Sequence, residues 1–140
     1  SEYDYFIMNS AVTDFKISEN TLRKIPKNNL EEYFKKNIEL VPDILKSLSK
    51  LKKRNQTFIG FCAFTGSIES SRSIIKEKIT TKGCDLIFAN PIDIKGQGFG
   101  HLAKNEGWLF DNKDMEYHIE KTSKLDLANR LISQIISINK

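Results

Sequence analysis

The sequence contains few of the residues that build metal centres and disulfide frameworks. Among its 140 residues there are only two cysteines, two histidines, three prolines and one tryptophan. His101 and His118 lie far from each other and from any cysteine at ligand spacing, so we expect no metal site. Cys62 and Cys84 lie in apolar runs, and no secretory signal peptide opens the sequence. This pattern predicts reduced core cysteines in a cytoplasmic protein, with a disulfide as the alternative.

Long apolar runs and concentrated charge are also lacking. No segment approaches the ~20 apolar residues of a membrane span, so we expect no membrane association. The net charge of +4 comes from lysines spread along the chain, with one tight cluster at Lys52, Lys53 and Arg54. Nucleic-acid-binding surfaces usually concentrate their basic residues and interleave them with aromatic ones. We therefore expect no nucleic-acid partner, and a solvated surface with a mild preference for anionic ligands.

The length and the apolar periodicities predict one α/β domain over residues 1–140. We expect buried strands at 6–12, 57–64 and 84–89, helices at 42–51, 68–82 and 123–138, and hairpins at 22–40 and 107–121. Within the first hairpin, residues 30–40 alternate apolar and polar side chains, which is typical of a half-exposed strand. Strands that alternate with helices indicate parallel pairing. The predicted fold class is therefore α/β. The chain should form the C-terminal portion of a Rossmann-like, doubly wound parallel sheet, with a β-hairpin extension.

Polar residues follow the first predicted strand and are the first candidates for chemistry. Ligands of open α/β sheets bind outside the carboxyl ends of the strands, where loops can present polar groups. Asp14 and Lys24 lie in that loop. A loop-capping role for the Asp14 carboxylate is the alternative. The glycine-rich segment 96–100 allows either a close backbone approach to a ligand or ordinary turn formation.

Six motifs occur in an order that resembles one family, the phosphopantothenoylcysteine synthetases, or phosphopantothenate–cysteine ligases. The family usually forms the C-terminal domain of the bifunctional coenzyme A biosynthesis flavoprotein. The resemblance covers essentially the whole chain, and its motifs are Ser10–Phe15, Lys24–Lys27, Pro42–Leu45, Gly60–Ala63, Lys82–Asn90 and Gly98–Gly100.

The resemblance implies ligation of cysteine to 4′-phosphopantothenate with CTP as co-substrate, through an acyl cytidylate. It implies Mg²⁺ with the triphosphate, no FMN in this segment, and either a homodimer or a complex with a chain that carries the missing N-terminal half. Lys24 corresponds to the catalytic loop lysine, near the reacting carboxylate and phosphates. The nucleotide-binding residues that the resemblance implies are Met8, Asn9, Ser10, Asp14, Lys24, Pro42, Asp43, Ile44, Leu45, Phe61, Lys78 and Lys82.

Some of these residues have a second interpretation. Lys78 and Lys82 are also the cations that a helix C-terminus favours, and Phe61, taken by itself, has the pattern of a core residue, as apolar strand residues usually do. The chain departs from the family at Phe64, where a glutamate is usual, and at Pro91, where an aspartate is usual. The glycine-rich turn and catalytic asparagine of the family's first half are absent from these residues. A non-catalytic nucleotide-binding or dimerisation remnant is therefore the alternative function.

Overall fold

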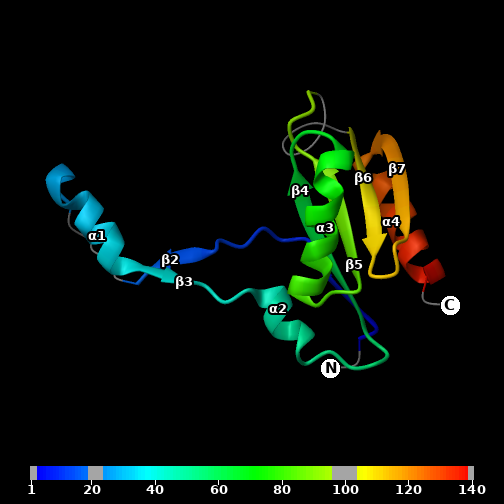
Figure 1. Cartoon of the computed structure of the whole chain (residues 1–140), viewed down its shortest axis with the longest axis horizontal. Helices are drawn as coiled ribbons and strands as arrows, with labels where there is room; N and C mark the ends of the chain where they lie inside the picture. Colours follow the sequence, from blue (N-terminus) through cyan, green and yellow to red (C-terminus); the bar gives the residue numbers. More distant parts are fainter. Residues whose placement is uncertain (1–2, 19–23, 96–103, 139–140) are drawn as a thin grey trace.

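A five-stranded mixed sheet forms the centre of the molecule (Figure 1). The structure is a computed structural model that describes residues 3–18, 24–95 and 104–138. In the sheet β1, β4 and β5 are parallel, and β6 and β7 continue it as an antiparallel hairpin. The strand order is β1-β4-β5-β6-β7, with bounds Tyr5–Met8, Thr57–Phe64, Leu86–Pro91, Lys104–Asp111 and Glu116–Ser123. The Rossmann-like α/β prediction with a hairpin extension is confirmed.

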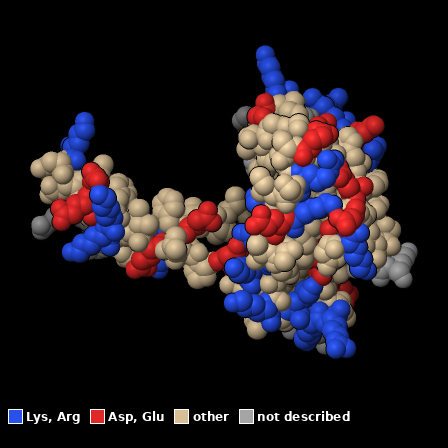
Figure 2. All heavy atoms as spheres, viewed as in Figure 1, with Lys and Arg blue, Asp and Glu red and all other residues tan. Residues whose placement is uncertain are grey.

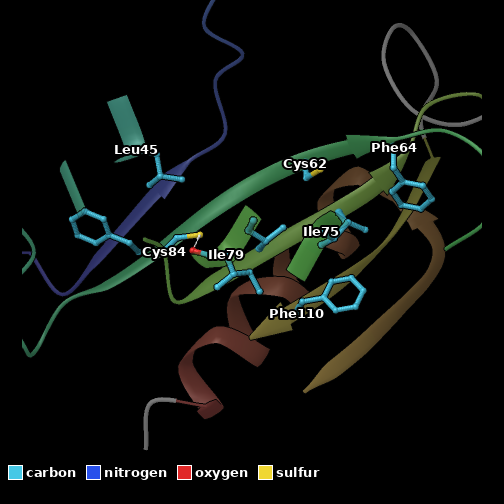
Figure 3. Close-up of a cluster of buried hydrophobic side chains, with 10 residues drawn as sticks. Leu45, Cys62, Phe64, Ile75, Ile79, Cys84 and Phe110 are labelled. Atoms are coloured by element: carbon cyan, nitrogen blue, oxygen red, sulfur yellow. Dashed lines mark hydrogen bonds between the residues drawn. The ribbon is translucent and has the colours of Figure 1, made fainter. Parts of the chain in front are cut away.

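Helices cover both faces of this sheet, and each face has its own apolar core. Helix α3 (Ile68–Lys82) and the short α2 (Ile44–Ser49) cover one face, and α4 (Lys124–Ile138) covers the other. Neighbouring residues of a strand point to opposite faces, so Ile87 packs under α3 whereas Leu86 packs against α4. Figure 3 shows the first core, in which Ile75 and Ile79 of α3 meet Phe110 of β6.

The boundaries of α3 and α4 follow from their capping residues. The Ser67 hydroxyl accepts a hydrogen bond from the Ser70 backbone N–H at 3.2 Å, and Ser123 accepts one from Asp126 at 3.0 Å. At the other end of α3, Gly83 adopts the left-handed conformation with φ 66° and closes the last turn. Both helices lie where the sequence predicted them.

A slender arm projects from the sheet between β1 and α2 (Figure 1). Its two short strands pair antiparallel, with Phe15 opposite Leu40 and Ile17 opposite Ile38. A 3₁₀ turn and a helix lie beyond this ribbon, and Figure 2 shows charges of both signs along the arm. The elements of the arm are β2 (Phe15–Ile17), η1 (Lys27–Asn29), α1 (Leu30–Asn37) and β3 (Ile38–Leu40).

The prediction of a strand over residues 30–40, paired with 22–27, was wrong. Most of that segment is α1, only its last three residues form β3, and β3 pairs with β2. Charge explains the helix, because Glu31 and Glu32 lie in its first turn and Lys35 and Lys36 in its last, which complements the helix dipole. Glu31 and Lys35 also form an i,i+4 ion pair at 2.6 Å.

Several boundaries also differ from the sequence-based expectations, and the hairpin of β6 and β7 spans residues 104–123 where 107–121 was expected. The first strand ends at Met8, and it is half exposed because it lies at the edge of the described sheet. Helix α2 begins at Ile44 with Asp43 as its N-cap, so Pro42 precedes the helix and is not in its first turn. The strand expected at 84–89 is β5, which is displaced by two residues. The glycine-rich segment 96–100 lies outside the described residues.

Candidate functional site

A cavity of about 380 Å³ opens where the arm joins the sheet. Its position follows from strand pairing, because the last register pair between β1 and β4 joins Met8 to Gly60. Beyond that pair the chain leaves β1 toward the arm, and one edge of β4 from Phe61 onward is left without β1 beside it. The lining comes from residues 8–14, 41–45 and 60–63, and from Lys78, Lys82, Ile87 and Asn90.

The cavity brings together every nucleotide-binding residue that the family resemblance implied, except Lys24. The implied residues in its lining come from the end of β1 and the loop after it, from the start of α2, from β4 and from α3, so they are far apart in the sequence and adjacent in space. Lys24 is exposed and does not line the cavity. It lies in the segment that leads into η1 of the arm, so the structure separates it from the residues grouped with it.

Lys82 reaches the cavity from the last turn of α3 and forms an ion pair with Asp43. The Asp43 carboxylate also caps α2 by accepting a hydrogen bond from the Lys46 backbone N–H at 3.0 Å. Partial burial raises the pKa of Asp43, but the Lys46 N–H and the Lys82 ammonium outweigh it, so the net pKa lies below its usual value of 3.8. The site therefore holds a carboxylate and an ammonium side by side.

Lys78 lies one helical turn before Lys82 and reaches the same cavity. Its Nζ lies 3.1 Å from the Sγ atom of Cys62, on β4. Cys62 itself faces the core under α3, as Figure 3 shows. The two lysines are thus more than solvated cations at a helix end, because each contacts a specific side chain of the cavity wall.

Asp14 and Phe61 also line the cavity, and both are exposed. The Asp14 carboxylate makes no hydrogen bond in the described part of the chain, although its backbone carbonyl accepts one from Val41 at 2.9 Å. The carboxylate therefore does not act as a loop cap there. Phe61 is 39% exposed, and its ring packs 5.5 Å from that of Phe88. Because Phe61 pairs with Phe88, its ring lies on the α4 side of the sheet, opposite to Cys62 and Lys78.

Sequence reasoning missed three polar members of the lining, Thr13, Cys62 and Asn90. Asn90 is only 8% exposed, and its Nδ2 atom donates to the Pro91 carbonyl oxygen at 3.3 Å. A polar residue at the carboxyl end of a buried strand is a signal that could have identified Asn90. Cys62 carried no such signal, because an apolar strand with one cysteine is typical of an ordinary core.

The two residues that depart from the family pattern are structural in this chain. Phe64 is buried, and its ring packs edge-on against Trp108 with centroids 5.8 Å apart. Pro91 is one of the fully buried side chains, and neither residue lines the cavity. The carboxylate that the family places at this strand end is thus replaced by an aromatic core contact.

Two further properties of the described residues bear on function. No group of three or more His, Cys, Asp or Glu side chains among them could hold a metal ion. None of the helices they form is long and apolar enough to cross a membrane. Both cysteines are free thiols in buried positions, as the sequence predicted.

Two curated proteins resemble this chain along most of its length. The coenzyme A biosynthesis bifunctional protein CoaBC of Bacillus subtilis (strain 168) is 30% identical over 144 residues, which cover 98% of this chain and 32% of the relative. A cysteine/cysteine sulfinic acid decarboxylase of an unknown prokaryotic organism is 29% identical over 137 residues, covering 98% of this chain and 36% of the relative. The chain thus spans only about a third of these relatives.

A solved structure and a family profile extend the comparison. The crystal structure of the C-terminal domain of coenzyme A biosynthesis bifunctional protein CoaBC superposes with a TM-score of 0.66 at 25% identity, covering 96% of this chain and 56% of that one. The profile described as the DNA/pantothenate metabolism flavoprotein C-terminal domain matches residues 1–138. This chain therefore belongs to the family of DNA/pantothenate metabolism flavoprotein C-terminal domains.

Proposed function

We propose that this chain is the C-terminal part of a CTP-dependent phosphopantothenate–cysteine ligase of coenzyme A biosynthesis. The observation that carries the proposal is that one cavity gathers all the implied nucleotide-binding residues except Lys24. The relatives named as coenzyme A biosynthesis bifunctional proteins support the assignment. Because the chain covers about a third of these relatives, the complete activity needs a segment that carries the missing half.

The proposed reaction has two steps. A carboxylate oxygen of 4′-phosphopantothenate attacks the α-phosphorus of CTP, which forms an acyl cytidylate and releases pyrophosphate. The amine of cysteine then attacks the acyl carbon, which forms the amide and releases CMP. The first step brings two anions together, so ammonium groups that face the phosphates lower its barrier. Lys78 and Lys82 are positioned on α3 to contribute this charge.

Ligand atoms can be matched to the remaining residues of the cavity by their chemistry. The Asp14 carboxylate, which makes no hydrogen bond with the described residues, is a suitable acceptor for ribose hydroxyl groups. The partly exposed ring of Phe61, at the edge of β4, is the candidate contact for the base. A triphosphate brings Mg²⁺ with it, held chiefly by phosphate oxygens and water. The absence of a three-ligand metal cluster from the described residues is compatible with that arrangement.

Lys24 reaches the reacting groups only if the arm segment that carries it moves, or if a second chain supplies it. We therefore include a homodimer in the proposal, with the arm as the contact. The arm exposes apolar side chains that nothing else in the described chain covers; the most exposed are Phe15 at 53% and Leu40 at 83%. The outer edge of β1 is also exposed, and we propose that a strand of the missing N-terminal half pairs with it.

The test is a pyrophosphate-release assay on this chain combined with a segment that carries the N-terminal half. CTP, 4′-phosphopantothenate and cysteine should together produce pyrophosphate and CMP. Lys24→Ala should lower kcat by about 10²–10³, the usual cost of losing one group that stabilises transition-state charge. Lys27→Ala, at an exposed lysine of the same segment, is the matched control and should leave kcat unchanged. Equal rates for the two variants would refute the catalytic role of Lys24.

The second candidate function is a nucleotide-binding or dimerisation remnant without catalysis. The position of Lys24 outside the cavity and the burial of Phe64 in place of a family glutamate favour it. A remnant binds CTP, or dimerises, and releases no pyrophosphate in the combined assay. Turnover that depends on Lys24 excludes the remnant.

A further inference from the structure

The two lysines of the cavity lie one turn apart on α3 but contact different side chains. The Lys78 ammonium faces the Cys62 thiol at 3.1 Å, and no carboxylate of the described residues forms an ion pair with it. A thiol is only a weak hydrogen-bond acceptor, so Lys78 is available to a stronger partner. Lys82 instead forms an ion pair with Asp43. The cavity therefore presents one available ammonium and one that already has an anionic partner.

The Asp43 carboxylate uses both of its oxygen atoms in these contacts. Its Oδ1 atom accepts a hydrogen bond from the Lys46 backbone N–H at 3.0 Å and so caps α2, while its Oδ2 atom contacts the Lys82 ammonium. Both members of the pair line the cavity, and their side chains are 30% exposed for Asp43 and 39% for Lys82. A ligand in the cavity can therefore reach the ion pair.

Close packing holds α2 in place independently of this ion pair. A Cβ atom added at Gly60 of β4 would lie 2.9 Å from the Leu45 side chain, and one added at Gly83 would lie 2.5 Å from the Ser49 hydroxyl oxygen. Helix α2 thus lies directly against β4 and against the end of α3. Because these contacts do not involve Asp43, loss of its charge should free the partner lysine without moving α2.

We propose that Asp43 is an internal competitor for Lys82, which holds the ammonium until a ligand with linked phosphate groups replaces it, and which thereby limits how tightly the cavity binds that ligand. An ammonium with an anionic partner gains less from a phosphate than a free one, because the first attraction is lost as the second forms. The ionised carboxylate also repels phosphates that approach its partner. The choice of phosphates rests on the proposed function, in which CTP and the released pyrophosphate carry them.

The competition has its clearest consequence for the release of pyrophosphate. Two free ammonium groups on one helix face would retain this anion, and slow product release limits the turnover of many enzymes. When the phosphates leave, Lys82 returns to the Asp43 carboxylate, so their departure opposes less attraction. Asp43 acts through Lys82 and is therefore a positioning residue, not a catalytic one.

Isothermal titration calorimetry of the full chain with inorganic pyrophosphate tests the proposal. Asp43→Asn keeps a capping oxygen but removes the charge, and it should bind pyrophosphate several-fold more tightly than the wild type. In the Lys82→Met background the same substitution should change the affinity much less, because no ammonium is left to exchange. Glu77→Gln is the matched control, since Glu77 is exposed on α3 outside the cavity lining, and it should leave the affinity unchanged. Thermal unfolding confirms that each variant is folded.

The outcomes separate this proposal from the proposed function. Pyrophosphate binding by Asp43→Asn that is equal to or weaker than that of the wild type overturns the competition, and so does an absence of binding by both chains. Equal tightening with and without Lys82 shows a general charge effect and also overturns it. Tighter pyrophosphate binding by Asp43→Asn, with no CTP binding by either chain, supports the competition and counts against the proposed function. CTP binding that Asp43→Asn leaves unchanged retains the proposed function and rejects the competition.

Discussion

In the sheet, the rings of Phe58, Phe88 and Phe110 are at most 2% exposed, whereas in the arm Phe15 is 53% and Phe34 is 37% exposed. Both regions use aromatic and β-branched residues, so their composition does not explain the difference. The sheet has a helix over each face, and the arm has two three-residue strands that no layer of the described residues covers. The sheet buries its apolar side chains within the chain, whereas the arm leaves its apolar side chains exposed, where a second protein surface can cover them.

This contrast explains where the cavity lies. A site at the junction takes its rigid wall from β4 and α3, which the core holds in place, and its open wall from residues 8–14 and 41–45, which lead to the arm. Asp43 and Lys82 join the two parts by an ion pair.

The largest expected effect is a difference in the free energy of unfolding between a substitution in the sheet and one in the arm. Phe110→Ala empties a fully buried position and should lower the free energy of unfolding by about 3–5 kcal/mol, through lost burial and a residual cavity. Phe15→Ala in the arm should change it by less than about 0.5 kcal/mol when the chain is monomeric. Urea denaturation at low protein concentration measures both. Similar losses for the two variants would show that the arm is part of the cooperative core.

The next effect concerns association. Leu40→Lys places a charge on the most exposed apolar residue of the arm and should weaken the proposed dimer by about 1–3 kcal/mol. Leu125→Lys is the matched control, because Leu125 is 72% exposed on α4, away from the arm. Sedimentation equilibrium measures the dissociation constant. A dimer that Leu125→Lys disrupts and Leu40→Lys does not would place the contact on the other region.

The smallest expected effect is on the pH dependence of stability, through the ion pair between Asp43 and Lys82. Because the pKa of Asp43 is lower in the folded state, its contribution to stability is present above pH 3.8 and is lost as the pH falls through the folded-state pKa. Asp43→Asn keeps a capping oxygen but cannot ionise, so its stability should fall less in acid than that of the wild type. Asp43→Ala also loses the cap, at about 1 kcal/mol.

Urea denaturation at several pH values gives these curves. Two identical acid dependences, for the wild type and for Asp43→Asn, would show that the ion pair with Lys82 adds nothing. The effect is modest because both side chains remain partly exposed to solvent, which screens their attraction.

The sequence predicted the core far better than the arm, for physical reasons. Strand β4 was identified with its exact bounds, because burial imposes apolar residues along it, and Gly83 marked the end of α3. Residues 30–40 do not pack against a core, so burial does not set the spacing of their apolar residues. The alternation of Phe34, Ile38 and Leu40 with polar residues therefore matched a strand by coincidence. The ion pair of Glu31 with Lys35 was the local signal of a helix.

The candidate site was predictable in part. Family resemblance supplied residues from distant segments, and the structure brings them into one cavity without Lys24. Periodicity alone could not distinguish Phe61 from a core residue, because its exposure depends on where β1 separates from β4. The contact between Lys78 and Cys62 joins a helix to a strand across the cavity wall, and no sequence pattern encodes such a pair.

The most direct test of nucleotide binding at the junction is an NMR titration of the isotopically labelled chain with CTP and Mg²⁺. The account predicts that backbone amide shifts concentrate in residues 8–14, 41–45 and 60–63 and in the last turns of α3, while α4 is unaffected. Lys78→Met and Lys82→Met should weaken these shifts. Shifts that concentrate on α4 or on the β6–β7 hairpin, or an absence of shifts at saturating CTP, would contradict it.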